Sequence, residues 1–116
     1  MAVSPSAVAA SISAALGAPP TEKLSRENHL FWKIQVLPTI RGAQVMGLLD
    51  GSDLAPPKTV EVEDEEKKKI NVPNQAYAVW LARDQTVMSY LVKSLDSDLL
   101  AQVIGHEHAH QVWSTI

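Results

Sequence analysis

The chain has 116 residues, no cysteine and a formal net charge of −3. A chain of this length forms one domain at most, and the absence of cysteine excludes disulfides, zinc knuckles and thiol chemistry. The slightly acidic balance gives no electrostatic reason to expect nucleic-acid binding. No apolar run approaches the roughly 20 residues that span a bilayer, so no membrane association is predicted.

The N-terminal segment, residues 1–22, is rich in Ala, Ser, Pro and Gly and ends at Pro19-Pro20. This composition predicts a disordered leader, with a short transient helix over AVAASISAAL as the alternative. The segment has no basic region of the kind that begins a secretory signal. A cytoplasmic protein is therefore expected, with a nuclear location left open.

A first helix is predicted from about residue 26 to about residue 41, with Ser25 as its N-cap. Its apolar residues occupy two sides of the cylinder. Leu30, Ile34 and Leu37 form one side, and Trp32, Val36 and Ile40 form the other. Such a helix must be covered on both sides, by the rest of the domain or by a partner. Pro38 predicts a kink or a break.

A short second helix is predicted over residues 43–49, with Gly51 suited to a left-handed cap. The connector that follows, residues 52–73, contains Pro56-Pro57, which excludes helix locally. Apolar and polar residues alternate near both ends of 58–72, so a small β-hairpin there is one interpretation. The other is a solvated loop around the EDEEKKK run.

The longest predicted helix runs from about residue 75 to about residue 94, behind Asn74 as N-cap. Its apolar residues recur at helical spacing and form one wide stripe of about five turns. The stripe consists of Tyr77, Trp80, Leu81, Val87, Met88, Leu91, Val92 and Leu95. A fourth helix over 97–104, capped by Asp96, and a fifth from 107 or 108 complete the prediction. The fold class is all-α, with about five helices over residues 23–116.

Asp84 lies within the stripe of the longest helix. A carboxylate in or beside a core must be paired or hydrogen-bonded. Lys33, Arg41 or the N–H groups of another helix N-terminus are expected to hold it. No second acid or histidine is in register with it, so a structural role is predicted and no catalytic residue is proposed.

The three tryptophans lie on apolar faces of three predicted helices, and they are expected to meet in one core. Without surrounding Lys and Arg, a platform for stacking bases is the weaker interpretation. The residues expected to be structural are Trp32, Leu37, Tyr77, Trp80, Leu81, Asp84, Met88, Leu91 and Trp113.

His106, Glu107 and His110 satisfy the pattern H-E-x-x-H. On a helix the two histidines could share a zinc ion, with Glu107 as general base. Gly105 places His106 at a helix boundary, however, and the third nearby histidine, His108, would point to the wrong face. We expect a polar helix start, with no cofactor and at most adventitious metal binding by the histidines.

Many individually weak matches follow the order and spacing N-x-x-x-W-K, L-P, G, and then N-x-x-Y-x-x-W-x-x-x-D-x-x-V-x-S-x-L. They fall at Asn28, Trp32, Lys33, Leu37, Pro38, Gly42, Gly51, Asn74, Tyr77, Trp80, Asp84, Val87, Ser89, Leu91, Ala109 and Trp113. In this respect the chain resembles, over residues 23–116, the N-terminal part of the gag polyprotein of plant Ty1/copia-type LTR retrotransposons. The resemblance implies a capsid N-terminal-like domain. It also implies a last helix that continues past Ile116, so the chain is interpreted as a fragment or a truncated gag-derived gene.

The resemblance implies a non-enzymatic assembly protein that forms homo-oligomers. Uncovered apolar surface would supply the interface, which is expected at Met46, Leu49, Val112 and Ile116. The alternative is a co-opted module that binds a host or viral protein or interferes with gag assembly. A zinc-dependent hydrolase built on the H-E-x-x-H pattern is a distant third hypothesis.

Overall fold

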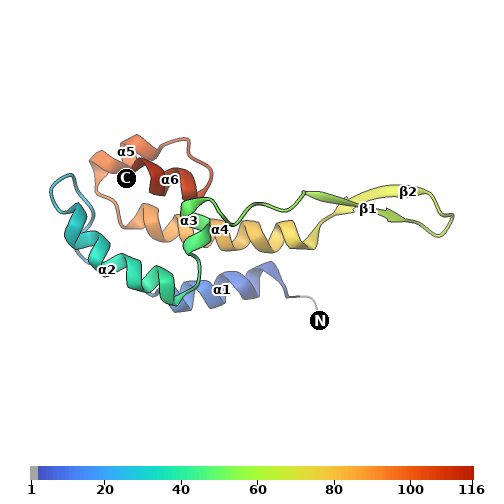
Figure 1. Cartoon of the computed structure of the whole chain (residues 1–116), viewed down its shortest axis with the longest axis horizontal. Coiled ribbons are helices and arrows are strands. Elements are labelled where there is room, and N and C mark those ends of the chain that lie inside the picture. Colours follow the sequence, from blue (N-terminus) through green and yellow to red (C-terminus); the bar gives the residue numbers. More distant parts are fainter. Residues whose placement is uncertain (1–2) are drawn as a thin grey trace.

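The computed structural model describes residues 3–116. Its helices and strands follow the order α1 (Pro5–Leu16), α2 (His29–Gly42), α3 (Met46–Asp50), β1 (Thr59–Glu63), β2 (Lys69–Pro73), α4 (Gln75–Lys93), α5 (Ser97–Val103) and α6 (Ala109–Thr115). Figure 1 shows α4 in the middle, with α1 and α2 along one side, α3, α5 and α6 along the other, and the β1–β2 hairpin projecting from one end. Among the described helices, none is both long enough and apolar enough to cross a bilayer.

Helix α1 lies in the segment for which we expected a disordered leader. That prediction is therefore wrong for residues 5–16. Residues 1 and 2 lie outside the described part of the chain. The Ser4 hydroxyl accepts a hydrogen bond from the Ala7 N–H at 3.1 Å, and a proline follows at the first helical position. Both features favour a helix start. Helix α1 packs along α4 and buries Ile12 and Leu16, which supplies the tertiary contact that a short helix needs.

Helix α2 begins at His29, three residues later than predicted, because Ser25 does not cap it. The Asn28 side chain accepts from the Ser25 N–H at 2.8 Å and folds the preceding turn instead. The helix continues past Pro38 to Gly42, so of the two outcomes expected there, a kink or a break, the break does not occur. Helix α3 is short and ends at Gly51, whose φ of 80° confirms the predicted left-handed cap.

Of the two interpretations of the connector, the structure shows the hairpin, with β1 and β2 antiparallel and Val60 opposite Val72. The acidic and basic run makes its turn, where the Asp64 carboxylate accepts from the N–H groups of Glu66 and Lys68 at 2.9 and 2.8 Å. These bonds hold the turn locally, as is usual for aspartate.

The predicted caps of α4 and α5 are confirmed. The Asn74 side chain accepts from the Ala76 N–H at 3.1 Å, and the Asp96 carboxylate accepts from the Leu99 N–H at 3.0 Å. The last helix, α6, begins after His108, close to the predicted start.

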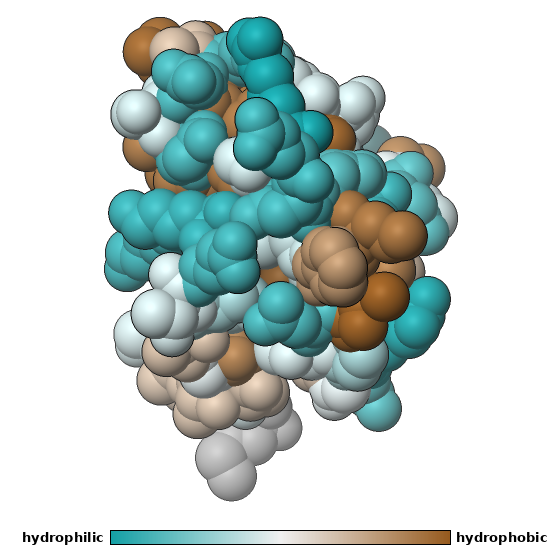
Figure 2. Space-filling view, turned by 90° about the vertical axis from the view of Figure 1, so that its left-hand side faces the viewer, coloured by the Kyte–Doolittle hydropathy of each residue, from teal (hydrophilic) through white to brown (hydrophobic). Residues whose placement is uncertain are grey.

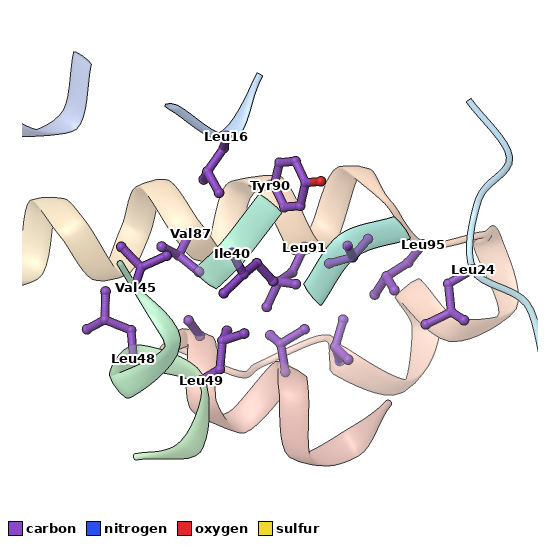
Figure 3. Packing of buried hydrophobic residues seen from close by; sticks show 14 of the residues in the cluster. Leu16, Leu24, Ile40, Val45, Leu48, Leu49, Val87, Tyr90, Leu91 and Leu95 are labelled. Carbon is purple, nitrogen blue, oxygen red and sulfur yellow. The ribbon is translucent and has the colours of Figure 1, made fainter. Parts of the chain in front are cut away.

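The core lies between α4 and the helices on either side of it (Figure 3). Of the residues expected to be structural, Trp32, Trp80, Asp84 and Leu91 are buried, and Tyr77, Leu81, Met88 and Trp113 are half-buried against the core. Leu37 was also expected to be structural, but it is only half-buried and lies outside the core cluster. Tyr90 was not predicted, yet it is buried on the side of α4 that faces α1; burial raises the pKa of its phenol.

The segment between α1 and α2 is fastened to the end of α4. The Leu24 N–H donates to the Ser94 carbonyl at 2.7 Å, and the Leu24 carbonyl accepts from the Asp96 N–H at 3.0 Å. The Leu24 side chain is almost fully buried there. These two bonds form a one-residue parallel bridge with Leu95, which ties the segment before α2 to the end of α4.

Candidate functional site

Three large apolar side chains of α2 face solvent. Leu30, Phe31 and Ile34 are 71, 73 and 64% exposed. Positions separated by three or four residues are neighbours on a helix, so the three side chains form one surface, which we call the α2 patch. Figure 2 shows the end of the molecule opposite the hairpin, where apolar side chains gather among polar ones.

The opposite face of α2 is fully used by the core. Trp32, Val36 and Ile40 are buried there, at spacings of four residues. The sequence correctly separates the two apolar sides of this helix, and the structure shows which one the domain covers. The exposed side is therefore a surplus of apolar surface that the fold does not need.

Helix α2 is also free of acidic residues. Its only formal charges are those of Lys33 and Arg41. The Lys33 ammonium lies 5.6 Å from the centroid of the Trp113 ring, a cation–π distance. The α2 patch is thus an apolar surface on a basic helix.

The four residues that we expected at an interface are buried in the core or packed against it. Leu49 and Val112 are buried, so neither is available to a partner, and that prediction is wrong for both. Met46 and Ile116 are half-buried against the core and expose only part of their surface. Periodicity identified these residues as apolar but could not show that α3 and α6 pack on each other.

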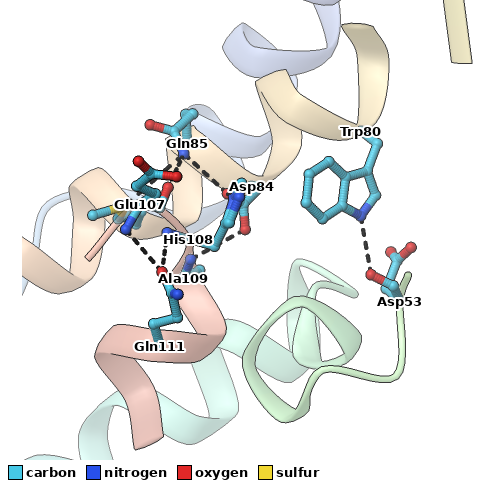
Figure 4. A network of polar contacts seen from close by, with 9 residues as sticks. Asp53, Trp80, Asp84, Gln85, Glu107, His108, Ala109 and Gln111 are labelled. Carbon is cyan, nitrogen blue, oxygen red and sulfur yellow. Dashed lines mark hydrogen bonds and ion pairs between the residues drawn. The ribbon is translucent and has the colours of Figure 1, made fainter. Parts of the chain in front are cut away.

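The buried carboxylate of Asp84 connects α4 to the start of α6 (Figure 4). It accepts from His108 Nδ1 at 2.8 Å, from the Ala109 N–H at 3.1 Å and from Gln85 Nε2 at 2.9 Å. Because a carboxylate only accepts, the His108 proton lies on Nδ1. The expectation of a helix N-terminal N–H is confirmed at Ala109. Lys33 and Arg41 do not hold Asp84, and the role of His108 was missed.

Glutamines close this network around the carboxylate. Gln85 Nε2 also donates to the Glu107 carbonyl at 2.8 Å. The Gln111 side-chain oxygen accepts from the N–H groups of Glu107 and His108 at 2.8 and 3.0 Å. The polar groups at the start of α6 are therefore satisfied, which is what burial of a carboxylate requires.

The H-E-x-x-H residues do not share one helical face. His106 precedes α6, and its Nε2 lies 2.8 Å from the Thr115 hydroxyl oxygen. His108 is engaged by Asp84, and its ring stacks on that of His110 with centroids 6.1 Å apart. Within residues 3–116, no three His, Cys, Asp or Glu side chains are placed to hold a metal ion. The geometry of a zinc-protease helix is not present.

The tryptophans form two groups rather than one. Trp32 and Trp113 lie with ring centroids 6.0 Å apart. Trp80 instead contacts the rings of Tyr77 and His108, at 6.1 and 5.4 Å, and its indole N–H donates to the Asp53 carbonyl at 3.0 Å. Both groups nevertheless belong to one hydrophobic core, because Trp32 and Trp80 lie in the same core cluster and Trp113 packs against it. The expectation that the three tryptophans meet in one core is therefore confirmed, although the three rings do not all contact one another.

An open pocket of about 580 Å³ lies where the connector crosses α4. Tyr77 and Trp80 form its aromatic wall, and Pro56 and Pro57 border it from the connector. Lys58 and Glu107 add one charge of each sign at its margin. Such a pocket suits an extended peptide with apolar side chains better than it suits a charged small molecule.

Comparison with known proteins gives two relatives, both from Arabidopsis thaliana: the retrovirus-related Pol polyproteins from transposons RE1 and RE2. Each is 28% identical to this chain over 94 residues, which cover 81% of the chain and 6% of the polyprotein. The chain thus corresponds to a small part of these relatives. No protein-family description matches it, and no solved structure matches it significantly. The two polyproteins support a retrotransposon origin for this chain.

Proposed function

We propose that the chain is a non-enzymatic assembly module of retrotransposon gag type, which self-associates in the cytoplasm as a capsid N-terminal-like domain. The observation that carries this proposal is the α2 patch. Leu30, Phe31 and Ile34 are exposed on a helix whose opposite face already completes the core. The similarity to two transposon polyproteins supports the retrotransposon origin on which this proposal rests.

The physical argument concerns uncovered apolar area. A contiguous exposed apolar surface bordered by polar residues is typical of a protein–protein interaction site. We infer that the partner of this surface is another copy of the same chain. Most soluble oligomers are homo-oligomers, so self-association is the expected use of such a surface. We assign no nucleic-acid binding to this segment, because the run Lys67-Lys68-Lys69 follows four consecutive acidic residues.

The test is the mass of the chain in solution. Sedimentation at several concentrations is expected to show dimers or larger species at high micromolar concentration. Phe31→Glu should shift the chain to monomers without changing its circular dichroism, because Phe31 is outside the core. Ile104→Glu is the matched control, since Ile104 is 82% exposed and lies outside the α2 patch. A wild-type chain that stays monomeric would overturn the proposal.

The pocket beside Trp80 favours a second candidate, a co-opted module that binds a peptide segment of a host or viral protein. Aromatic and proline side chains line this pocket, and peptide-binding grooves commonly use such surfaces. A monomer at every concentration, together with tight binding of a peptide at Trp80, would favour this function over assembly. Quenching of Trp80 fluorescence, compared with a Trp80→Phe variant, would report that binding.

A further inference from the structure

The hairpin has one apolar face and one polar face. In its register Val60 pairs with Val72 and Val62 pairs with Ile70, and the side chains of these two pairs share one side of the ribbon. Val60, Val62 and Ile70 are 38, 39 and 44% exposed. We call these four residues the hairpin face. The opposite side carries Thr59, Glu61, Glu63, Lys69, Asn71 and Pro73.

The hairpin face has no cover within the described chain. Figure 1 shows β1 and β2 extending away from the helices, and no helix packs across them among residues 3–116. A two-stranded hairpin is marginally stable in water and gains stability when an apolar face packs on something else. The alternation of residues in β1 and β2 therefore produces a face that needs a partner.

The hairpin and α2 are complementary in charge. Residues 59–73 carry five acidic residues and three lysines, whereas residues 29–42 carry Lys33 and Arg41 and no acid. Two of the lysines are already paired within the hairpin, Lys69 with Glu61 at 3.7 Å and Lys68 with Glu66 at 3.5 Å. An acidic ribbon and a basic helix attract each other, while two hairpins or two α2 helices repel.

The two surfaces cannot meet within one molecule. The described chain measures 62 Å along its longest axis and only 27 and 20 Å across. The hairpin projects at one end of this axis, and the start of α2 lies toward the other (Figure 1). Only another copy can place a hairpin on the α2 patch.

We propose that the hairpin face of one copy docks on the α2 patch of the next, in a head-to-tail contact that builds rings or filaments rather than closed symmetric dimers. This inference rests on the proposed assembly function and specifies its geometry. A contact between two different surfaces leaves one free surface of each kind at the ends of every oligomer. Growth then stops only when a ring closes.

Two variants separate the two surfaces. Phe31→Glu disables the α2 patch and leaves the hairpin intact. The double variant Val62→Glu/Ile70→Lys disables the hairpin face, and its opposite charges face each other across the strands, so the hairpin keeps a favourable cross-strand pair. Ile104→Glu serves as control, because it alters neither surface. Circular dichroism verifies that each variant is folded.

The decisive measurement is the mass of each variant alone and of their 1:1 mixture. Each variant alone should be monomeric at a concentration where the wild type is oligomeric. The mixture should form a heterodimer and nothing larger, because it contains one intact surface of each kind. The Ile104→Glu control should oligomerise like the wild type.

Other outcomes are distinct. A hairpin variant that oligomerises like the wild type would overturn the head-to-tail contact and leave the assembly function standing on an α2–α2 interface. An α2 variant that still associates would indicate contacts between hairpins, and a mixture that stays monomeric would also refute the proposal. A monomeric wild type would overturn the assembly function itself.

Discussion

The carboxylate of Asp84 and the imidazole of His108 lie 2.8 Å apart, and their contact joins the middle of α4 to the N-terminus of α6. Asp84 is 1% exposed, so it depends on partners from the protein. Removal of the imidazole would leave the carboxylate with the Ala109 N–H and the Gln85 amide only. This arrangement explains why an acidic residue is stable within an otherwise apolar stripe.

His108→Ala is expected to lower the free energy of unfolding by about 1–3 kcal/mol, the usual cost of a buried group that loses its partner. His110→Ala is the matched control and should change it by less than about 0.5 kcal/mol, because His110 is exposed. Urea denaturation of both variants measures the difference. Equal effects in the two variants would show that the Asp84 contact contributes nothing.

Trp80→Ala should destabilise the fold by about 3–5 kcal/mol, since it removes a large buried aromatic between Tyr77 and His108. Trp80→Phe keeps most of the apolar volume but leaves the Asp53 carbonyl without its donor. It should therefore cost clearly less. A loss below about 1 kcal/mol for the alanine variant would place Trp80 on the surface.

Leu16→Ala tests whether α1 belongs to the folded domain. Leu16 is buried near the end of α1, and its truncation is expected to cost about 2 kcal/mol, the low end for a buried leucine. Ala10→Ser, at an exposed position of the same helix, should cost only a few tenths of a kcal/mol. If thermal denaturation shows no difference between these variants, the N-terminal segment behaves as a leader after all.

Tyr90 should make the fold sensitive to alkali. Burial raises the pKa of the Tyr90 phenol in the folded state. Below the ordinary pKa of tyrosine the phenol is neutral in both the folded and the unfolded state, so the stability of the fold is complete there. As the pH rises through that value and then through the higher folded pKa, the unfolded state loses its proton first and the fold weakens. Tyr90→Phe should reduce this loss in pH-dependent denaturation between about pH 9 and pH 11.

Metal removal should leave the fold unchanged. His106 Nε2 is hydrogen-bonded to the Thr115 hydroxyl, and His108 Nδ1 is hydrogen-bonded to Asp84. Both histidines precede α6, so they do not lie on one face of that helix. Excess EDTA is expected to leave the melting temperature within about 1 °C, well under the shift that 1 kcal/mol produces in a domain this small. A fall of several degrees would revive the zinc hypothesis.

The long helix α4 could be predicted almost to the residue, because local features define it. Asn74 caps it, its apolar stripe has helical spacing, and Asp96 starts the next helix. Helix α1 has almost no stripe of large apolar residues, because many of its positions are alanines. Only Ile12 and Leu16 are buried there. The Ser4-Pro5 pair is the local signal that could have predicted the start of α1.

The candidate site was only half predictable. Periodicity separated the two sides of α2, but it could not show which side the domain covers, because that depends on how α4 and α6 pack around it. For the same reason Leu49 and Val112 were assigned to an interface when they belong to the core. The His108 partner of Asp84 comes from a different helix start, and no local pattern in the chain connects the two residues.

The bridge between Leu24 and Leu95 has a consequence for the order in which the protein folds. These residues lie in opposite halves of the chain, and α1 also packs mainly on the later helix α4. During synthesis the first two helices therefore leave the ribosome with their apolar sides unmatched until α4 follows them. Folding should be a late, nearly all-or-none event, because the non-local contacts must close together. Until then the unmatched helices are exposed to other nascent chains made nearby.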